Sequence, residues 1–458
     1  MKSHPHPNPL PERERAAGPL PREGEGWGGG ESSATSLPWV RLVALNALAF
    51  ALGFVTNTLE PAVLGHRTLE MAPEVKDTVF GLITFAGLVV AILWQPIIGD
   101  ISDRSHTRWG RRLPYIVGGG AALMAALYLV AVAPGLAALL VLLLLLQLSS
   151  NTVQAPSQAL LPDHVPEVQR GAAAGWKSAV EILAFVVGRQ VSGRLVADGR
   201  VLAAVSVAAA AVALAVLIVA LTIRRTSSVP AGLSVPAFSL RRAFAFDRRR
   251  HPSFGPWFVN RVLVWGGFIA LNTFLLFFVI DVLRLPEARA QRFVGDLSAL
   301  MGMGLILVAL PAGWLSDRFG RRRLVAAAGV AAAGGTALLL AAPSTTMALV
   351  AGGILGVSVG VFLTASWAIA TQIVPGMEAA RMLGLANIAT AAGSGLARLG
   401  GGLIIDPFNR LTGSSAGGYF LLYSLAGVAF LAGTVAILRL PPDTPPANLK
   451  ASPKSPTD

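Results

Sequence analysis

Twelve stretches of about 20 largely apolar residues dominate this chain, and each is long enough to cross roughly 30 Å of hydrocarbon as a helix. Inside a membrane the backbone must satisfy its own hydrogen bonds, which favours helices. Charged residues make up 13% of the chain, whereas a soluble protein needs roughly a quarter. The sequence therefore predicts an all-α membrane protein with 12 transmembrane helices. The expected spans are 41–63, 78–99, 113–133, 136–161, 171–196, 201–223, 255–280, 293–315, 323–342, 346–373, 382–405 and 417–438.

The spans divide into two groups of six, which sets the expected domain organisation. Residues 39–223 would form an N-terminal bundle and 254–440 a C-terminal bundle, joined by a basic cytoplasmic linker at 224–253. The tails at 1–38 and 441–458 are rich in proline and polar residues and cannot bury a core, so we expect both to be disordered.

Charge and composition exclude several classes of function. The formal net charge is +13, but Lys and Arg gather on the side that holds both termini, as in cytoplasmic loops. We therefore expect a multi-pass protein of the plasma (inner) membrane with both termini cytoplasmic, in contact with lipid and not with nucleic acid. Cysteine is absent, the six histidines are scattered, and no Gly-x-x-x-x-Gly-Lys loop occurs. We expect no cofactor, no metal site and no catalytic residue, and predict that the protein is not an enzyme.

The two halves of the chain repeat a loop motif. Gly-Asp-Ile-Ser-Asp-Arg at 99–104 follows the second span, Gly-Trp-Leu-Ser-Asp-Arg at 313–318 follows the eighth, and each continues to Gly-Arg-Arg. A second pair of similar segments, after spans four and ten, has nearly the same offset. Duplicated halves joined by a cytoplasmic linker are typical of alternating-access transporters.

The repeated loops are candidates for a gate. Glycine permits a tight turn, and the aspartates can pair with arginines or with the positive end of a helix. Such a cluster at the cytoplasmic mouth would hold one state closed; the simpler interpretation is a set of basic loops that only fixes topology. The expected gating residues are Asp103, Arg104, Gly110, Arg111, Arg112, Asp317, Arg318, Arg321 and Arg322.

Several of these segments resemble a known family. The run at 313–322 looks like the signature loop of the major facilitator superfamily. The run Ser-Asp-Arg-Ser-His-Thr-Arg-Trp-Gly-Arg-Arg-Leu-Pro-Tyr at 102–115 resembles the sucrose-type branch of the glycoside–pentoside–hexuronide cation symporters, as do 151–156, 273–276 and 366–368. The resemblance implies two pseudo-symmetric six-helix bundles (the major facilitator fold) and sugar transport driven by a cation gradient.

Four amides in span four form a polar stripe. Gln147, Asn151, Gln154 and Gln158 are spaced by four, three and four residues, which puts them on one helical face. An amide that faced lipid would lack a partner, so the stripe must face protein or water. Neutral amides suit sugar hydroxyls, and we predict that these four bind substrate; hydrogen bonding between helices is the alternative.

The same stripe departs from the resembled family. Sucrose-type transporters have an aspartate, their expected proton carrier, where Gln147 stands, and an arginine where Gln158 stands; an amide cannot titrate. Other candidates for ion coupling are Glu181 with Lys177, one turn apart in span five, and Glu60 late in span one. The alternatives are a buried structural ion pair for the first two and a marker of the span's end for Glu60.

The C-terminal half supplies further candidates for substrate binding. Arg261 lies about 9 Å into span seven, where it would bind a substrate oxygen or snorkel to the interface. Trp367 would stack on a sugar's apolar face or pack within the bundle. Asn272 and Gln372 complete the predicted set. Two more arginines inside the spans, with expected structural or interfacial roles, are Arg189 and Arg398.

Together these features predict a secondary active transporter that moves a small sugar or glycoside by alternating access. The resemblance favours symport with a proton as the coupling ion, with sodium as the other choice, and we expect a monomer. Two alternatives remain open: an exporter of amphipathic compounds on the same fold, which needs a mainly apolar cavity, and a non-transporting membrane sensor.

Overall fold

The structure, a computed structural model, describes residues 37–105, 107–223, 253–341, 343–373 and 379–440, without the side chains of 167, 309, 310, 317, 371–373 and 379–386. In these ranges every regular element is helical, as expected for a backbone that must satisfy its own hydrogen bonds in lipid. Twelve helices there are long and apolar enough to cross a membrane. The predicted linker and tails lie almost wholly outside the described residues.

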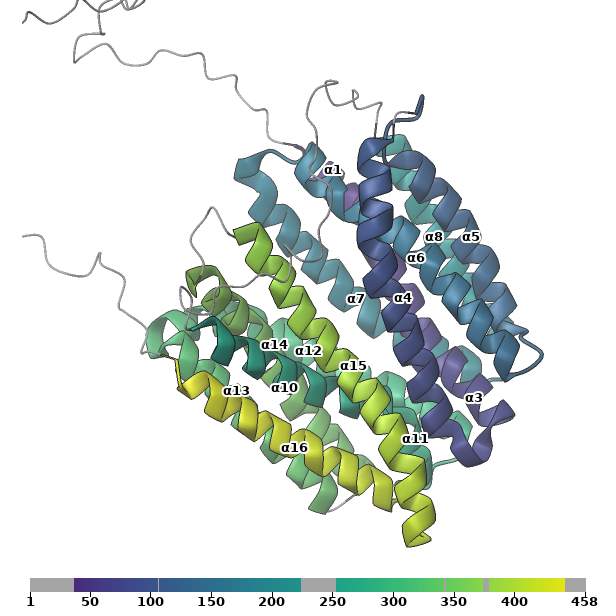
Figure 1. The fold of residues 1–458 in the computed structure, drawn as a ribbon, viewed down its shortest axis with the longest axis vertical. Helices are drawn as coiled ribbons and strands as arrows, with labels where there is room; N and C mark the ends of the chain where they lie inside the picture. Colours follow the sequence, from purple (N-terminus) through teal and green to yellow (C-terminus); the bar gives the residue numbers. More distant parts are fainter. Residues whose placement is uncertain (1–36, 106, 224–252, 342, 374–378, 441–458) are drawn as a thin grey trace, which may run out of the picture.

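The first six spans form the N-terminal bundle (Figure 1). The first span is a continuous run of four elements: α1 Trp39–Leu45, α2 Ala47–Thr58, a π-helical turn η2 Leu59–Leu64, and α3 Gly65–Met71. The remaining elements of this bundle are η3 Pro73–Val75, α4 Lys76–Arg104, α5 Leu113–Ala131, α6 Leu136–His164, η4 Glu167–Gln169, α7 Arg170–Ala197 and α8 Val201–Thr222.

The last six spans form the C-terminal bundle. The predicted seventh span is interrupted at Phe274, which separates two helices of different length. The elements are α10 Phe254–Thr273, α11 Leu275–Asp281, α12 Glu287–Phe319, α13 Arg321–Ala341, α14 Thr345–Ile373, α15 Ala379–Thr412 and α16 Gly417–Leu438.

The helices of the two bundles pack in equivalent ways. Helix α2 contacts α7 and α8, and its counterpart α10 contacts α15 and α16. Likewise α5 contacts α6 and α8 as α13 contacts α14 and α16, and α4 contacts α6 as α12 contacts α14. This equivalence confirms the prediction of two pseudo-symmetric six-helix bundles that the repeated loops suggested.

Because consecutive spans run in opposite directions, the connections fall on two faces. We call the face where α1 and α10 begin and where α8 and α16 end the terminal face. The distal face holds the connections from α3 to α4, from α7 to α8 and from α11 to α12. The bundles meet along two pairs of long helices, α4 with α15 and α7 with α12 (Figure 1).

Candidate functional site

The contact between α4 and α15 is concentrated in the distal half of α4. The backbone N–H of Thr78 donates to Asp406 Oδ2 at 2.7 Å, and the Thr78 hydroxyl donates to the carbonyl of Gly402 at 2.8 Å. Gly81 lies so close to α15 that an added Cβ would stand 2.5 Å from the carbonyl oxygen of Arg398. The two backbones therefore touch here, which only a residue without a side chain allows.

The contact between α7 and α12 is distal as well. Gln190 donates to Asp296 at 3.0 Å, and Arg292 pairs with Asp198 at 2.6 Å, near the end of α7. Among the described side chains, every ion pair that joins the two bundles lies in the distal half or at mid-helix. The bundles are thus closed against each other on the distal side, without a matching set of ion pairs between described side chains at the terminal face.

A bidentate ion pair crosses between the bundles in the π-helical turn of the first span. Arg398 donates to both carboxylate oxygens of Glu60, at 2.7 and 3.0 Å. Pro61 has no N–H to donate, which weakens the regular helix and favours the wider turn that holds Glu60. Because Glu60 lies inside the continuous run from Trp39 to Met71, the interpretation that it marks the end of the span is wrong.

A second arginine ties the bundles together at a similar level. Arg189 is 5% exposed and donates to Asn57 at 3.3 Å, to Asn272 at 2.9 Å and to Ser298 at 3.2 Å. Its first partner comes from the N-terminal bundle and the other two come from the C-terminal bundle. Of the two roles expected for Arg189, the structural one fits, because the side chain is buried between the bundles and does not reach the membrane–water interface. The amide oxygen of Asn272, a predicted substrate group, is occupied by this arginine.

A cluster of charges at the distal face was not predicted at all. Lys76 Nζ lies 2.6 Å from Asp281 Oδ2 and 3.5 Å from Asp77 Oδ2. The Tyr419 hydroxyl lies within hydrogen-bond distance of the same two oxygens. These residues come from α4, α11 and α16. Each alone looks like an ordinary charge or tyrosine near the end of a span, and their wide separation in sequence hides the cluster.

A histidine makes a further cross-bundle contact on this face. His66 Nδ1 lies 2.7 Å from Glu287 Oε1, at the start of α12, and His66 Nε2 lies 3.3 Å from Glu70. The side-chain amide of Gln291 donates to the carbonyl of Ala62 at 3.4 Å. The distal face is therefore held by polar contacts from the first span as well.

The first copy of the loop motif forms a compact ion-pair cluster at the terminal face. Arg112, which is buried, contacts Asp103 and also Asp163 at 3.2 Å, and Arg111 pairs with Asp163 at 2.7 Å. Gly110 has a φ of 88°, the left-handed region that glycine enters without strain. All of these contacts stay within the N-terminal bundle. Arg104 pairs with Asp100 on its own helix.

The second copy of the motif makes different contacts. Gly320 has a φ of 91°, so the turn glycine matches Gly110 and the repeat extends to backbone conformation. Arg321 donates to the carbonyl of Ala368 at 2.9 Å, and Arg322 donates to the carbonyl of Leu440. Arg318 lies over the ring of Trp314. The predicted gating residue Asp317 has a side chain outside the described set.

The residues of the predicted amide stripe differ in exposure along α6. Asn151 is buried, and its amide donates to the carbonyl of Gln147 on the preceding turn. Gln147 lies against Gly87 of α4, and Gln158 is exposed and accepts from Gln95 at 3.3 Å. Hydrogen bonding within and between helices therefore accounts for part of the stripe. Gln154 is partly exposed.

The charged pair predicted in the fifth span is formed, but it is not buried in the bundle. Lys177 Nζ lies 2.6 Å from Glu181 Oε1, and the side chains are 33% and 45% exposed. Both lie in the terminal half of α7, where no ion pair between described side chains reaches the other bundle. The alternative of a buried structural pair is therefore wrong.

Arg261 and two tryptophans form a stacked group in the C-terminal bundle. The guanidinium centre lies 5.6 Å from the Trp257 ring and 4.8 Å from the Trp367 ring. It donates to Thr390 at 3.0 Å and to Ser366 at 3.4 Å. The side chain is buried, so it does not snorkel to the interface. The structure places Arg261 and Trp367, two of the predicted substrate groups, next to each other; the side chain of Gln372 lies outside the described set.

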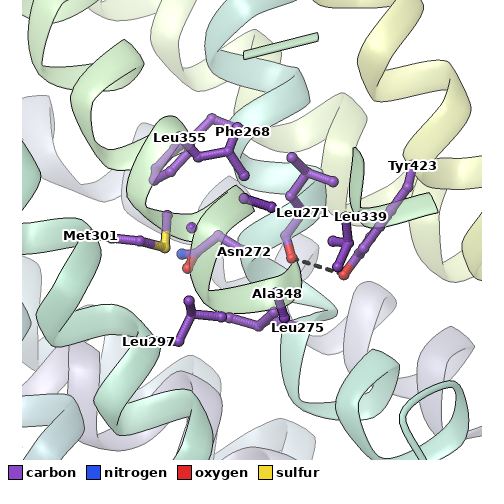
Figure 2. A pocket seen from close by; sticks show the side chains of 12 residues that line it. Phe268, Leu271, Asn272, Leu275, Leu297, Met301, Leu339, Ala348, Leu355 and Tyr423 are labelled. Carbon is purple, nitrogen blue, oxygen red and sulfur yellow. Dashed lines mark hydrogen bonds between the residues drawn. The ribbon is translucent and has the colours of Figure 1, made fainter. Parts of the chain in front are cut away.

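Figure 2 shows a pocket inside the C-terminal bundle, lined from α10 to α14 and α16. Its lining is mostly apolar, with Phe268, Leu297 and Met301 among the larger side chains. The Tyr423 hydroxyl donates to the carbonyl of Leu271 at 3.1 Å and is therefore satisfied (Figure 2). This pocket offers few free polar groups and does not suit a sugar. Among the described residues, no group of three or more His, Cys, Asp or Glu side chains is arranged to hold a metal ion.

Comparisons with known proteins identify the family. The family model described as MFS/sugar transport protein matches residues 40–437. The solved structure of the nucleoside transporter NupG aligns with a TM-score of 0.64 at 16% identity, over 88% of this chain and 100% of that chain. A bacterial homologue of the human lysosomal transporter Spinster, in an inward-facing and occupied conformation, aligns with a TM-score of 0.67 at 18% identity, over 87% and 95%.

The peptide transporter POT in complex with sulfate aligns with a TM-score of 0.67 at 15% identity, over 87% of this chain and 93% of that chain. At these identities the likeness shows the fold, and the family match extends over most of the sequence. The chain therefore belongs to the MFS/sugar transport protein family and is a multi-pass transporter of the major facilitator superfamily.

Proposed function

We propose that this transporter takes up a small sugar or glycoside across the inner membrane by alternating access, as a monomer with both termini in the cytoplasm. The terminal face is then cytoplasmic and the distal face external. The observation that carries the proposal is the distribution of the cross-bundle contacts, which close the external half and leave the cytoplasmic half without ion pairs between described side chains. Rocking of two similar bundles would exchange these states.

The proposed substrate class rests on neutral hydrogen-bonding groups. Amides donate and accept, as sugar hydroxyls do, so Gln147, Gln154 and Gln158 suit a polyol. Trp367, stacked with Arg261, offers an aromatic face of the kind that packs on a sugar ring. The family description names sugar transport, and the run at 102–115 resembles sucrose-type symporters.

A cation gradient, in the first instance of protons, would drive the uptake. The stripe in α6 has amides where the resembled family has its titrating acid, so another carboxylate must serve. Glu181 with Lys177 and Glu60 with Arg398 are the candidates. Glu60 would lose Arg398 when the bundles move apart, whereas Glu181 would keep Lys177 on its own helix and change its exposure to water. Either change makes the carboxylate bind protons differently in the two states, and coupling requires this difference.

The motif loops would gate the cytoplasmic face. In the present state Asp103, Arg111 and Arg112 are satisfied within their own bundle. When the terminal face closes, these loops would approach the other bundle and exchange part of these contacts for cross-bundle ones.

Uptake of a radiolabelled disaccharide into proteoliposomes, with and without an imposed proton gradient, tests this function. We expect accumulation that the gradient stimulates. If Glu181 carries the proton, Glu181→Gln loses the stimulation, whereas Glu60→Gln keeps it. The exposed Glu74, in the short helix η3 before α4, provides a matched control as Glu74→Gln, which should behave like the wild type.

Other outcomes would contradict parts of the proposal. Stimulation by a sodium gradient alone would reassign the coupling ion. Failure to accumulate any of a panel of sugars and glycosides, together with proton-driven extrusion of an amphipathic dye, would favour an exporter instead.

A further inference from the structure

The distal charge cluster holds one hydroxyl between two carboxylates. Tyr419 Oη lies 2.8 Å from Asp77 Oδ2 and 2.7 Å from Asp281 Oδ2, both at hydrogen-bond distance. A phenol has a single proton and can donate only one hydrogen bond. If both aspartates were ionised, one of these contacts would place two oxygen lone pairs against each other. The geometry therefore requires a further proton on one of the two acids.

The lysine indicates which aspartate is ionised. Lys76 Nζ lies 2.6 Å from Asp281 Oδ2 but 3.5 Å from Asp77 Oδ2. Asp281 thus accepts from the ammonium group and from the Tyr419 hydroxyl, as an anion does. The additional proton belongs on Asp77 Oδ2, where it donates to the Tyr419 oxygen. The hydrogen bonds then form a chain from Asp77 through Tyr419 to Asp281.

The other oxygen of Asp77 independently favours a neutral acid. The Asp77 side chain is 0% exposed, and its Oδ1 is buried without a hydrogen-bond partner in the structure. An ionised carboxylate with one bare buried oxygen carries a heavy desolvation cost, whereas a protonated acid leaves only a carbonyl oxygen unsatisfied.

Of the remaining groups around Asp77, one is an acid and the other is a neutral tyrosine. Asp406, from α15, accepts from the Thr78 N–H in the first turn of α4, where an anion is stabilised by the helix dipole. Tyr423 of α16 has its hydroxyl bound to the carbonyl of Leu271. The titratable groups that face Asp77 from the packed elements are therefore Lys76, Asp281, Asp406, Tyr419 and Tyr423.

We propose that Asp77 is a proton-binding site that locks the distal face closed. The inference rests on the alternating access proposed above: Asp77 and Lys76 belong to one bundle, and Asp281, Asp406 and Tyr419 to the other. When the distal face opens, Asp77 loses Tyr419, meets water and releases its proton to that side. When the face closes, a proton is taken up again from the same side. This proton is not transported; it sets the balance between the two states.

One proton bound on closing has a quantitative consequence. The closed state binds one more proton than the open state at each pH above the range in which an aspartate in water titrates, about pH 4, and below the pH at which Asp77 loses its proton in the closed state. Within that window the ratio of closed to open distal faces falls tenfold for each unit of pH increase, and it levels off on either side.

Spin labels on the distal face can measure this ratio directly. The chain has no cysteine, so Val132→Cys and Ser415→Cys introduce unique labelling sites. Both residues are exposed, one in the connection after α5 and the other in that after α15, so they report from opposite bundles. His66 faces Glu287 across the same interface, and a histidine can change its charge between about pH 5 and 8, within the pH range of this measurement. The measurements therefore use a His66→Gln background.

Pulsed electron spin resonance on the labelled protein in nanodiscs gives the two distance populations as a function of pH. In the His66→Gln background we expect the ratio of closed to open populations to fall tenfold for each unit of pH increase. In Asp77→Asn the amide can donate to Tyr419 without titrating, so the slope disappears while the closed population remains. The matched control Asp406→Asn changes a neighbouring acid that already accepts a backbone N–H, and should keep the slope. A slope unchanged in Asp77→Asn would overturn the proposal.

Infrared difference spectroscopy provides a second measurement that does not depend on opening. At neutral pH, with the distal face closed, the wild type minus Asp77→Asn spectrum should contain the carbonyl stretch of a protonated carboxylic acid. If only carboxylate bands are lost, both aspartates share Lys76 as anions and the proposal fails. Neither measurement needs a substrate, so the proposed proton-binding site is tested separately from the proposed sugar uptake.

Discussion

At the scale of single residues, three arginines inside this transporter connect helices through hydrogen bonds. Glu60 holds Arg398 through two hydrogen bonds, while Arg189 is satisfied by neutral amides and a hydroxyl. Arg261 is held by two hydroxyls and two indole rings. Such placements keep the cations solvated by protein groups, and they tie the state of each arginine to the position of the helices around it.

The Glu60–Arg398 pair should show a measurable coupling. Glu60→Gln leaves Arg398 without its anion and should lower the thermal unfolding midpoint in detergent, and Arg398→Gln should do the same by stranding Glu60. The double variant should lose less stability than the sum of the losses in the two single variants. The difference is the coupling energy of the pair, roughly 0.5–3 kcal/mol. Strictly additive losses would show that the two side chains do not interact in the folded protein.

At the scale of elements, glycine sets how closely the bundles approach. Gly81 on α4 faces Arg398 and Gly402 on α15. An added Cβ would stand 2.5 Å from the carbonyl oxygen of Arg398 and 2.8 Å from the Cα of Gly402. Backbone atoms cannot rotate away as side chains can, so the helices would have to separate. This is the helix-to-helix contact that small residues make possible in membranes.

Gly81→Ala should therefore destabilise the closed distal face by roughly 1–3 kcal/mol. The expected result is a larger population of long distances between spin labels at positions 132 and 415. Gly400→Ala on α15 is the matched control, because an added Cβ there meets nothing within 4 Å. Equal effects of the two substitutions would mean that helix propensity, and not the close contact, controls the equilibrium.

At the scale of the whole molecule, the cross-bundle contacts are distributed unevenly between the two faces. Cross-bundle ion pairs run from Glu60 at mid-helix to Arg292 and Asp198 at the distal end. The two contacts between the bundles, α4 on α15 and α7 on α12, are related by the pseudo-symmetry. Under the proposed alternating access, transport requires the distal set to break in each cycle.

Holding the distal face closed should stop transport. In the cysteine-free chain, Asp198→Cys with Arg292→Cys replaces an exposed cross-bundle pair. A short reducible bifunctional maleimide cross-linker should abolish uptake in proteoliposomes, and cleavage of the linker should restore it. Each single variant, treated in the same way, serves as the control and should retain uptake. Full activity of the cross-linked double variant would argue against rocking at this interface.

The sequence by itself determined the class of the protein and its architecture. Apolar runs of bilayer length leave few options besides helices, because backbone groups find no partners in hydrocarbon. The repeated Gly-x-x-Ser-Asp-Arg loops implied duplicated halves, and the matched turn glycines Gly110 and Gly320 bear this out in conformation. These properties are local or periodic, so they can be read along the chain.

Only the tertiary structure decided which charges meet. Glu60 and Arg398 are partners although 338 positions separate them, and Asp77 and Tyr419 although 342 do. In the sequence each is a single polar residue in or near a span, with several roles open to it. Their energies depend on a partner brought close by the docking of one bundle on the other, and no helical period or motif spacing specifies that docking. Lys177 and Glu181 remain partly exposed in the terminal half of α7, which their depth in the span did not indicate.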